Sequence, residues 1–105
     1  MTNSLVVMVT VPSKKDSENI SKTVLDKKLC ACVNIVGGVR SLFYWKNKID
    51  DTEEFLLIIK TNKEKYKELE DSIKKIHPYS VPEIIALPIA FGSNDYLDWI
   101  NDTVK

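Results

Sequence analysis

The strongest strand signal in the sequence is Leu5-Val6-Val7-Met8-Val9-Thr10-Val11. The run is rich in β-branched residues and ends at Pro12-Ser13, a pattern typical of a strand followed by a turn. Ser13 and Asp16 then form a capping box, which predicts a helix over residues 14–28. The apolar positions of this helix lie on one stripe, at Ile20, Val24 and Leu25.

The middle of the sequence predicts two further strands. Residues 31–45 are mostly apolar and are interrupted by Gly37-Gly38, which predicts one long strand that bends at a bulge. Residues 46–52 are polar and include Asn47, which tolerates a left-handed backbone, so we expect a hairpin connection there. The next strand is predicted over residues 54–60.

The last part of the sequence predicts a helix, a strand and a shorter helix. Thr61 and Glu64 read as a capping box for a helix that Pro78 ends. Residues 81–89 predict a strand, and Pro88 places its end at an unpaired edge or a bulge. Ser93 then caps a short helix whose apolar residues are Tyr96, Leu97, Trp99 and Ile100.

The order of these elements is βαββαβ followed by a C-terminal helix, in one domain over residues 1–105. It predicts an α+β fold, a ferredoxin-like sandwich with two helices on one face of an antiparallel sheet. Three of the strands are apolar at nearly every position. In a sheet with one solvent-exposed face, apolar and polar residues should instead alternate along each strand. We therefore expect a second copy of the chain to cover the other face, in a homo-oligomer.

Composition excludes several classes of protein. The 105 residues include 15 Lys plus Arg and 15 Asp plus Glu, and a net charge of zero argues against bulk nucleic-acid binding and against a polybasic membrane anchor. No apolar run approaches the ~20 residues needed to span a bilayer. Residues 1–4 carry no basic segment of a secretory signal, so we expect a soluble protein of the cytoplasm or of an organelle.

The sequence contains few candidates for metal ligands. His77, the sole histidine, stands at the end of a predicted helix with Tyr79 and Glu83 nearby, and either ligates a metal or interacts with the terminal carbonyl groups of that helix. Cys30 and Cys32 are expected to be reduced thiols, and are either soft ligands for monovalent copper or buried apolar groups.

Two surface clusters have competing interpretations. The acidic residues around the predicted hairpin either attract a cation weakly or form a solvated edge, and we favour the solvated edge; they are Asp50, Asp51, Glu53 and Glu54. The aromatic residues suggest either a platform for a planar ligand or packing in the core or at an interface, and we favour packing; they are Phe43, Tyr44, Trp45 and Trp99. No nucleophile and base stand in a known catalytic pattern, so we expect the protein not to be an enzyme.

Five blocks of the sequence resemble the signature blocks of the CutA family, the divalent-cation-tolerance proteins. The match runs from about Leu5 to Ile100. The blocks are Ala31-Cys32-Val33-Asn34-Ile35, Ser41-Leu42-Phe43-Tyr44-Trp45, Lys60-Thr61, His77-Pro78-Tyr79 with Val81-Pro82-Glu83, and Tyr96-Leu97-Asp98-Trp99-Ile100. The resemblance implies a ferredoxin-like protomer in a tight homotrimer, a link to tolerance of divalent metals and of copper in particular, and an architecture similar to the trimeric PII signalling proteins.

The chain departs from the family pattern at the positions of the bacterial copper site. The family's cysteine near the end of the first strand falls on Val9, and its histidine pair falls on Ile76 and His77. A metal would therefore use His77 together with Glu83, Cys32 or a neighbouring subunit. The Trp-Glu-Gly of many members is Trp45-Lys46-Asn47 here, which changes the charge of an intersubunit cleft.

The resemblance and the residues together predict a non-enzymatic trimeric protein that binds copper or another divalent cation, with His77, Glu83 and Cys32 as candidate ligands. One alternative is a PII-like sensor that holds a small effector between subunits, with Arg40, Trp45, Lys60 and Tyr79 in the cleft. Another is a structural scaffold for a partner protein. Nucleic acid and membranes are not expected as partners.

Overall fold

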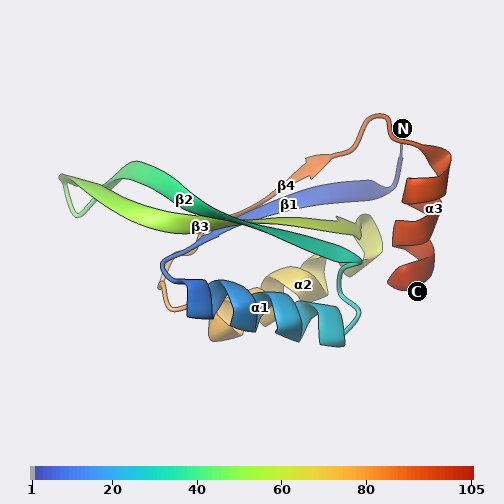
Figure 1. Cartoon of the computed structure of the whole chain (residues 1–105), viewed down its shortest axis with the longest axis horizontal. Coiled ribbons are helices and arrows are strands. Elements are labelled where there is room, and N and C mark those ends of the chain that lie inside the picture. The colour runs from blue at the N-terminus through green and yellow to red at the C-terminus, as the bar shows by residue number, and fades with distance from the viewer. Residues whose placement is uncertain (1) are drawn as a thin grey trace.

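The computed structural model describes residues 2–105 and forms one sheet with three helices (Figure 1). The elements are β1 (Ser4–Val11), α1 (Lys14–Asp26), β2 (Cys32–Trp45), β3 (Lys48–Asn62), α2 (Lys63–Ile76), β4 (Ile84–Pro88) and α3 (Asn94–Thr103). The strand order is β2-β3-β1-β4, and all neighbours are antiparallel. Helices α1 and α2 lie on one face of the sheet and α3 lies at its end, which confirms the ferredoxin-like α+β fold with a C-terminal helix.

The core lies between the sheet and the helices α1 and α2. Alternate residues of β1 and β3 point into it because side chains of a strand alternate between the two faces. Its fully buried residues include Val7, Val9, Leu57, Ile59, Ile20, Val24, Leu69 and Ile73. Burial of each such side chain contributes about 1.5–3 kcal/mol to stability, so this layer is the main source of the free energy of folding.

The helix N-termini are capped by side chains, as the sequence predicts for two of the three. Ser13 Oγ accepts a hydrogen bond from the amide of Asp16, and Ser93 Oγ accepts one from the amide of Tyr96. The prediction of Thr61 as the cap of α2 is wrong. Asn62 accepts the hydrogen bond from the amide of Lys65, whereas the Thr61 hydroxyl is buried and donates to the carbonyl of Leu29.

Helix α1 ends at Asp26, two residues before the predicted end. Lys28 has a φ of 55°, the left-handed conformation in which L residues are strained. The amide of Lys28 donates to the carbonyl of Leu25 and the amide of Leu29 to that of Val24. This is the Schellman arrangement, with a lysine at the position that usually carries glycine.

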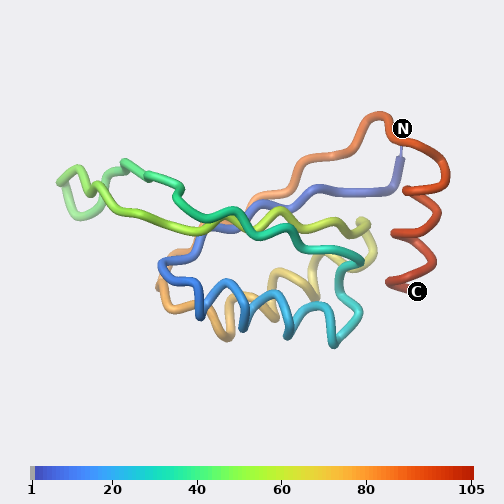
Figure 2. Tube along the Cα trace, in the orientation of Figure 1, coloured from blue at the N-terminus to red at the C-terminus, as the bar shows by residue number. Residues whose placement is uncertain are grey.

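Strands β2 and β3 form a hairpin arm, residues 39–54, that projects away from the rest of the molecule (Figures 1 and 2). The predicted hairpin connection with a left-handed Asn47 is confirmed, but its extent over residues 46–52 is wrong, because the turn contains only Lys46 and Asn47, with φ values of 51° and 65°. Two left-handed residues match the twist of paired strands, so pairing continues to Trp45 and Lys48. The predicted bulge is confirmed by a register shift between Val36 and Val39.

Strand β4 is shorter than the predicted strand over residues 81–89, since it begins only at Ile84. It pairs with β1 alone, which confirms that Pro88 lies on an edge strand. The chain ends marked N and C both lie at the α3 end of the molecule, opposite the tip of the hairpin arm (Figure 1).

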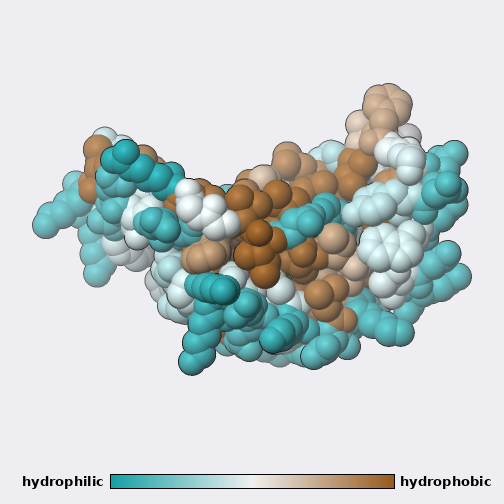
Figure 3. All heavy atoms as spheres, viewed as in Figure 1, coloured by the Kyte–Doolittle hydropathy of each residue, from teal (hydrophilic) through white to brown (hydrophobic). Residues whose placement is uncertain are grey.

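The sheet face turned away from α1 and α2 carries mostly apolar side chains and is called the open face here. Its residues are Val6, Met8, Thr10, Cys32, Asn34, Val36, Leu56, Ile58, Lys60, Ile85 and Leu87. Ile85 and Leu87 are 48% and 51% exposed. Hydrophobic residues gather over the centre of the molecule in Figure 3, between polar surfaces at the arm and at the helices. Within residues 2–105, the helices are too short and too polar to cross a bilayer.

Candidate cation and effector sites

The imidazole of His77 is buried and bonded on both sides to the backbone. Nε2 lies 2.8 Å from the carbonyl oxygen of Thr10 on β1, and Nδ1 accepts a hydrogen bond of 3.1 Å from the amide of Tyr79. Because Nδ1 accepts, the proton is on Nε2, which donates to the carbonyl. A metal ion at His77 would have to displace one of these two bonds. The partner carbonyl belongs to β1 and not to the terminal turn of α2.

Glu83 lies at the same end of β1 as His77, and Cys32 lies elsewhere. Glu83 directly precedes Ile84, which pairs with Val9. Cys32 pairs with Lys60, four residues of β3 away from the partner of Thr10, or about 13 Å at the rise of a strand. Among residues 2–105 no three His, Cys, Asp or Glu side chains form a group able to hold a metal ion.

Tyr79 holds the carboxylate of Glu54 in a nearly dry environment. The phenol of Tyr79 donates a hydrogen bond of 2.8 Å to Glu54 Oε2, and Glu54 is only 4% exposed. Burial, and after it the Glu54 carboxylate, raise the pKa of Tyr79 to about 12. The interpretation of Glu54 as part of a solvated acidic hairpin is therefore wrong. Its position just before the apolar residues 55–59 is the sequence signal that could have identified it.

Lys60 forms a small polar cluster within the apolar open face. Its ammonium group donates hydrogen bonds to Asn34 Oδ1 and to Cys32 Sγ, the latter over 3.8 Å. The Cys32 thiol in turn lies 3.9 Å from Asn34 Oδ1. The carboxylates of residues 2–105 all lie more than 4 Å from this ammonium group. The cluster thus carries one positive charge that only neutral groups solvate.

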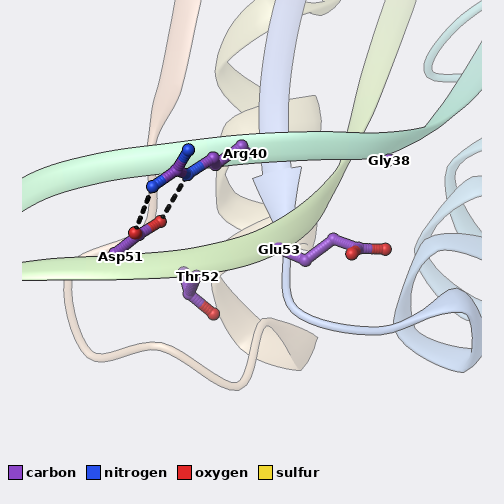
Figure 4. Close-up of a pocket in the computed structure, with 5 residues that line it drawn as sticks. All are labelled: Gly38, Arg40, Asp51, Thr52 and Glu53. Carbon is purple, nitrogen blue, oxygen red and sulfur yellow. Dashed lines mark hydrogen bonds and ion pairs between the residues drawn. The ribbon is translucent and has the colours of Figure 1, made fainter.

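Arg40 lies on the hairpin arm and is neutralised there. Its Nε and Nη2 atoms donate to the two carboxylate oxygens of Asp51, at 2.9 and 2.6 Å, as the dashed lines in Figure 4 show. The hydrogen bonds between the two side chains raise the pKa of Arg40 and lower the pKa of Asp51. The pair borders a shallow hollow of about 400 Å³ that also includes Gly38, Thr52 and Glu53, with the Glu53 side chain pointing away from the pair.

The four residues expected in an effector cleft do not meet within one chain. Arg40 and Lys60 are separated by seven residues of β3, since Arg40 pairs with Glu53, and this is about 23 Å. Trp45 lies at the turn of the arm, farther still from Lys60. Tyr79 lies on the segment between α2 and β4. A cleft that contains all four would have to combine parts of different copies of the chain.

The two cysteines are both free, as predicted, and lie in different environments. Cys30 is buried in the core, and its burial is the main cause that raises its pKa to about 12. Cys32 is half-buried on the open face beside Tyr96 of α3. Trp99 packs against Tyr96 with a ring distance of 5.6 Å and not against the aromatic residues of the arm. Sequence spacing gave no signal for the contact of Tyr96 on α3 with Cys32 at the start of β2.

The fold and these sites define the chain as a ferredoxin-like α+β protein with an open apolar sheet face and a projecting hairpin. The family model described as CutA1 divalent ion tolerance protein matches residues 5–103. The chain belongs to this family.

Relatives and solved structures agree with this assignment over nearly the whole chain. The divalent-cation tolerance protein CutA of Thermus thermophilus is 43% identical, with 92% of this chain and 94% of the relative covered. The structure of the periplasmic divalent cation tolerance protein CutA from Archaeoglobus fulgidus superposes with a TM-score of 0.94 at 43% identity, covering 97% of this chain and 99% of that one. The structure of CutA1 from Oryza sativa superposes with a TM-score of 0.95 at 41% identity, covering 99% of this chain and 95% of that one.

Proposed function

We propose that the protein is a non-enzymatic homotrimer that contributes to tolerance of divalent cations and binds copper or another such ion at sites shared between copies. The family and the names of the relatives support the link to divalent cations. The observation that carries the proposal is the exposed apolar surface of the open face, which a second copy would cover. The candidate ligands are also too far apart in one chain to form a site, so a shared site needs more than one copy.

The exposed apolar side chains support the proposed assembly. Ile85 and Leu87 at the edge of the open face are half exposed, and Phe91 in the following segment is 93% exposed. Water in contact with such a surface is unfavourable by roughly 25 cal/mol per Å² of apolar area, so burial between copies stabilises the assembly. A closed ring of copies leaves no apolar face free, which favours a small symmetric oligomer.

Sedimentation velocity at micromolar concentration tests the assembly. We expect a species of three times the chain mass of 12.0 kDa. Ile85→Glu should shift the protein to smaller species, because it introduces a charge into the open face. Leu25→Glu is the matched control, since Leu25 is a 38% exposed apolar residue on α1, on the other side of the molecule, and should remain trimeric. A single wild-type species of 12.0 kDa would refute the assembly.

The cation would be held where groups from several copies converge. His77 and Glu83 lie at the same end of β1, and the half-buried thiol of Cys32 is a soft ligand suited to monovalent copper. Metal binding at His77 Nδ1 requires the amide of Tyr79 to leave that atom. We therefore expect copper binding through His77 to be accompanied by movement of residues 77–83.

Calorimetry with cuprous and cupric ions tests the ligands one by one. We expect His77→Ala and Glu83→Gln to weaken the same ion and Cys32→Ser to weaken cuprous ion selectively. Circular dichroism checks that each variant is folded. Equal binding by the wild type and His77→Ala would eliminate His77 as a ligand. The metal content of the protein after purification without an affinity tag shows whether a cation accompanies it.

The proposal that the protein is not an enzyme is supported by the hydrogen bonds of His77. Both nitrogens of the only histidine are engaged with backbone groups, so it is not poised as a general base.

A second candidate function is the binding of a small effector by a PII-like assembly. The ammonium group of Lys60 favours it, because this charge lies in an apolar face without a carboxylate of residues 2–105 within 4 Å. An anionic ligand would supply the missing charge. A thermal-shift screen with nucleotides and carboxylates tests this function, and no shift at millimolar concentration would count against it.

A further inference from the structure

Two charged groups of β3 have no partner of opposite charge within residues 2–105. The ion pairs of these residues include neither Lys60 nor Glu54. The Lys60 ammonium group donates hydrogen bonds to the amide of Asn34 and to the thiol of Cys32. Glu54 Oε2 accepts a hydrogen bond from the phenol of Tyr79. The strand therefore carries one uncompensated positive charge and one uncompensated negative charge.

The two charged groups leave β3 on the same side of the sheet, at some distance from each other. Side chains of a strand alternate between its two faces, and Glu54 and Lys60 are six residues apart, so they share a face. Leu56 and Ile58 lie between them on this face and are apolar. At the rise of a strand the separation is about 20 Å, so the two charges cannot pair within one chain.

Assembly through the open face makes both charges costly unless they find partners. In the proposed assembly a second copy removes water from Lys60, and Glu54 is only 4% exposed even in a single chain. A charge that has lost its water is strongly unfavourable when no opposite charge replaces that water. Apolar side chains of a second copy can cover Leu56 and Ile58, whereas the two ends of this row require complementary charges.

One carboxylate oxygen of Glu54 remains within reach of a neighbouring copy. The hydrogen bond from Tyr79 uses Oε2, and within residues 2–105 no donor contacts Oε1. In this part of the chain, the buried side-chain oxygens without a partner belong to Ser4 and Ser21, so Glu54 Oε1 keeps some contact with solvent. A lysine suits such a narrow opening, because its flexible stem carries a compact ammonium group.

We propose that Lys60 of each copy forms an ion pair with Glu54 of the partner subunit in the trimer. Lys60 Nζ donates a hydrogen bond to the free Oε1 atom, while Tyr79 of the partner subunit keeps its bond to Oε2. In a closed ring, each copy gives its Lys60 to one neighbour and receives a Lys60 from the other, so every such charge is paired.

The pair joins two parts of the molecule that are separate in one chain. It brings Lys60 and Tyr79, two of the four residues expected in an effector cleft, to one site between subunits. The partner's Glu54 supplies the negative charge that the second candidate function takes from a ligand. The inference rests on the proposed assembly and names the contact that fixes how the copies face one another.

A double-mutant cycle on the trimer tests the pair. Lys60→Met removes the charge and keeps a stem of similar length, and Glu54→Gln keeps an acceptor for Tyr79. Sedimentation velocity over a dilution series, in urea at which the wild-type trimer begins to dissociate, gives the chain concentration of half-dissociation. We expect Lys60→Met to raise this concentration at least about tenfold when Glu54 is present, because a buried carboxylate loses its partner. In the Glu54→Gln background the same substitution should change it less than about threefold.

A second lysine of β3 provides the matched control. Lys48 is exposed on the hairpin arm, and Lys48→Met should have the same effect in both backgrounds. An effect of Lys48→Met that depends on Glu54, in place of that of Lys60→Met, would overturn the pair and assign the cation to the arm. Circular dichroism without urea checks the folding of each variant, and Lys60→Gln replaces Lys60→Met in the cycle if the latter does not fold.

The outcomes separate the ion pair from the assembly. A wild-type protein that remains at 12.0 kDa at every concentration would overturn the assembly and the pair together. A wild-type trimer in which Lys60→Met has an equal effect with and without Glu54→Gln would overturn the pair alone. Because about 20 Å separates the two residues in one chain, a dependence of one on the other supports contact between copies.

Discussion

Tyr79 and Glu54, which are 25 residues apart in the chain, are joined by a hydrogen bond of 2.8 Å at the end of β1. Glu54 lies one residue beyond Phe55, the last partner of β1 on β3, so the bond closes the sheet where β1 stops. The backbone amide of Tyr79 also donates a hydrogen bond to Nδ1 of His77. Tyr79 therefore fixes the segment between α2 and β4 by both its backbone and its side chain.

The phenol of Tyr79 should be important for stability. We expect Tyr79→Phe to lower the free energy of unfolding by about 1–3 kcal/mol, because it leaves a buried carboxylate without its hydrogen-bond donor. Urea denaturation followed by circular dichroism measures this value. Tyr44→Phe is the control, because Tyr44 is 77% exposed on the hairpin arm and should change little. Equal values for the two variants would contradict the role of the bond.

Alkaline pH should weaken the same contact. The pKa of Tyr79 is raised to about 12 in the folded chain, against an ordinary value of 10.0, so between these values the unfolded chain binds fewer protons. The stabilisation is complete below about pH 10 and is lost as pH rises toward 12. We expect the difference in stability between wild type and Tyr79→Phe to shrink over this interval. A constant difference would show that Tyr79 does not titrate in this way.

Helix α1 contains a buried hydroxyl group that weakens the fold. Among residues 2–105, Ser21 Oγ is buried without a hydrogen-bond partner, whereas Ser17 Oγ on the same helix donates to the carbonyl of Lys14 at 2.6 Å. Alanine improves helix propensity equally at both positions. We therefore expect Ser21→Ala to be more stable than Ser17→Ala by about 1–3 kcal/mol in denaturant titrations. The opposite order would mean that Ser21 has a partner in solution.

The end of α1 offers a stabilising substitution. Lys28 has a left-handed backbone, which glycine adopts without strain, so Lys28→Gly should raise stability by about 1 kcal/mol. Lys27 has a φ of −83°, and Lys27→Gly should instead lower stability, since it only adds freedom to the unfolded chain. Thermal unfolding of the two variants gives the comparison. A loss of stability in Lys28→Gly would contradict the assigned conformation.

The two thiols should differ strongly in reactivity. Only the thiolate reacts with disulfide reagents, and burial raises the pKa of Cys30 to about 12. At pH 8 we expect one fast-reacting thiol per folded chain, which Cys32→Ser removes and Cys30→Ser retains. In denaturant, two thiols should react. Equal rates for both thiols in the folded protein would contradict the burial of Cys30.

Local signals in the sequence predicted much of the fold. Ser13 with Asp16, Gly37-Gly38 and Pro88 each act through neighbouring residues, and each lies where the sequence placed it. The start of β3 over residues 48–53 was missed, because these residues pair with β2 without an apolar face and no alternation marks the strand. Thr61 and Asn62 are both common N-cap residue types, and the hydrogen bond of the Thr61 hydroxyl to the carbonyl of Leu29 decides between them.

The sites were harder to predict because they depend on contacts between distant parts of the chain. The contact of Tyr79 with Glu54 and that of Tyr96 with Cys32 join segments whose approach only the sheet and α3 define. Lys60 was identified as a candidate because the Lys60-Thr61 block resembles the CutA family, whose architecture implies a cleft between subunits. Its lack of a charged partner became visible only with Asn34 and Cys32 in place.

The two chain ends lie beside α3, at the opposite end of the molecule from the turn at Lys46 and Asn47 (Figure 1). The longest dimension of the molecule is 44 Å, and most of it separates these two regions. A dye or a fused protein attached at Lys105 would therefore stay clear of the hairpin arm. Energy transfer between such a label and one on Lys46 would follow the position of the arm directly, in solution and during assembly.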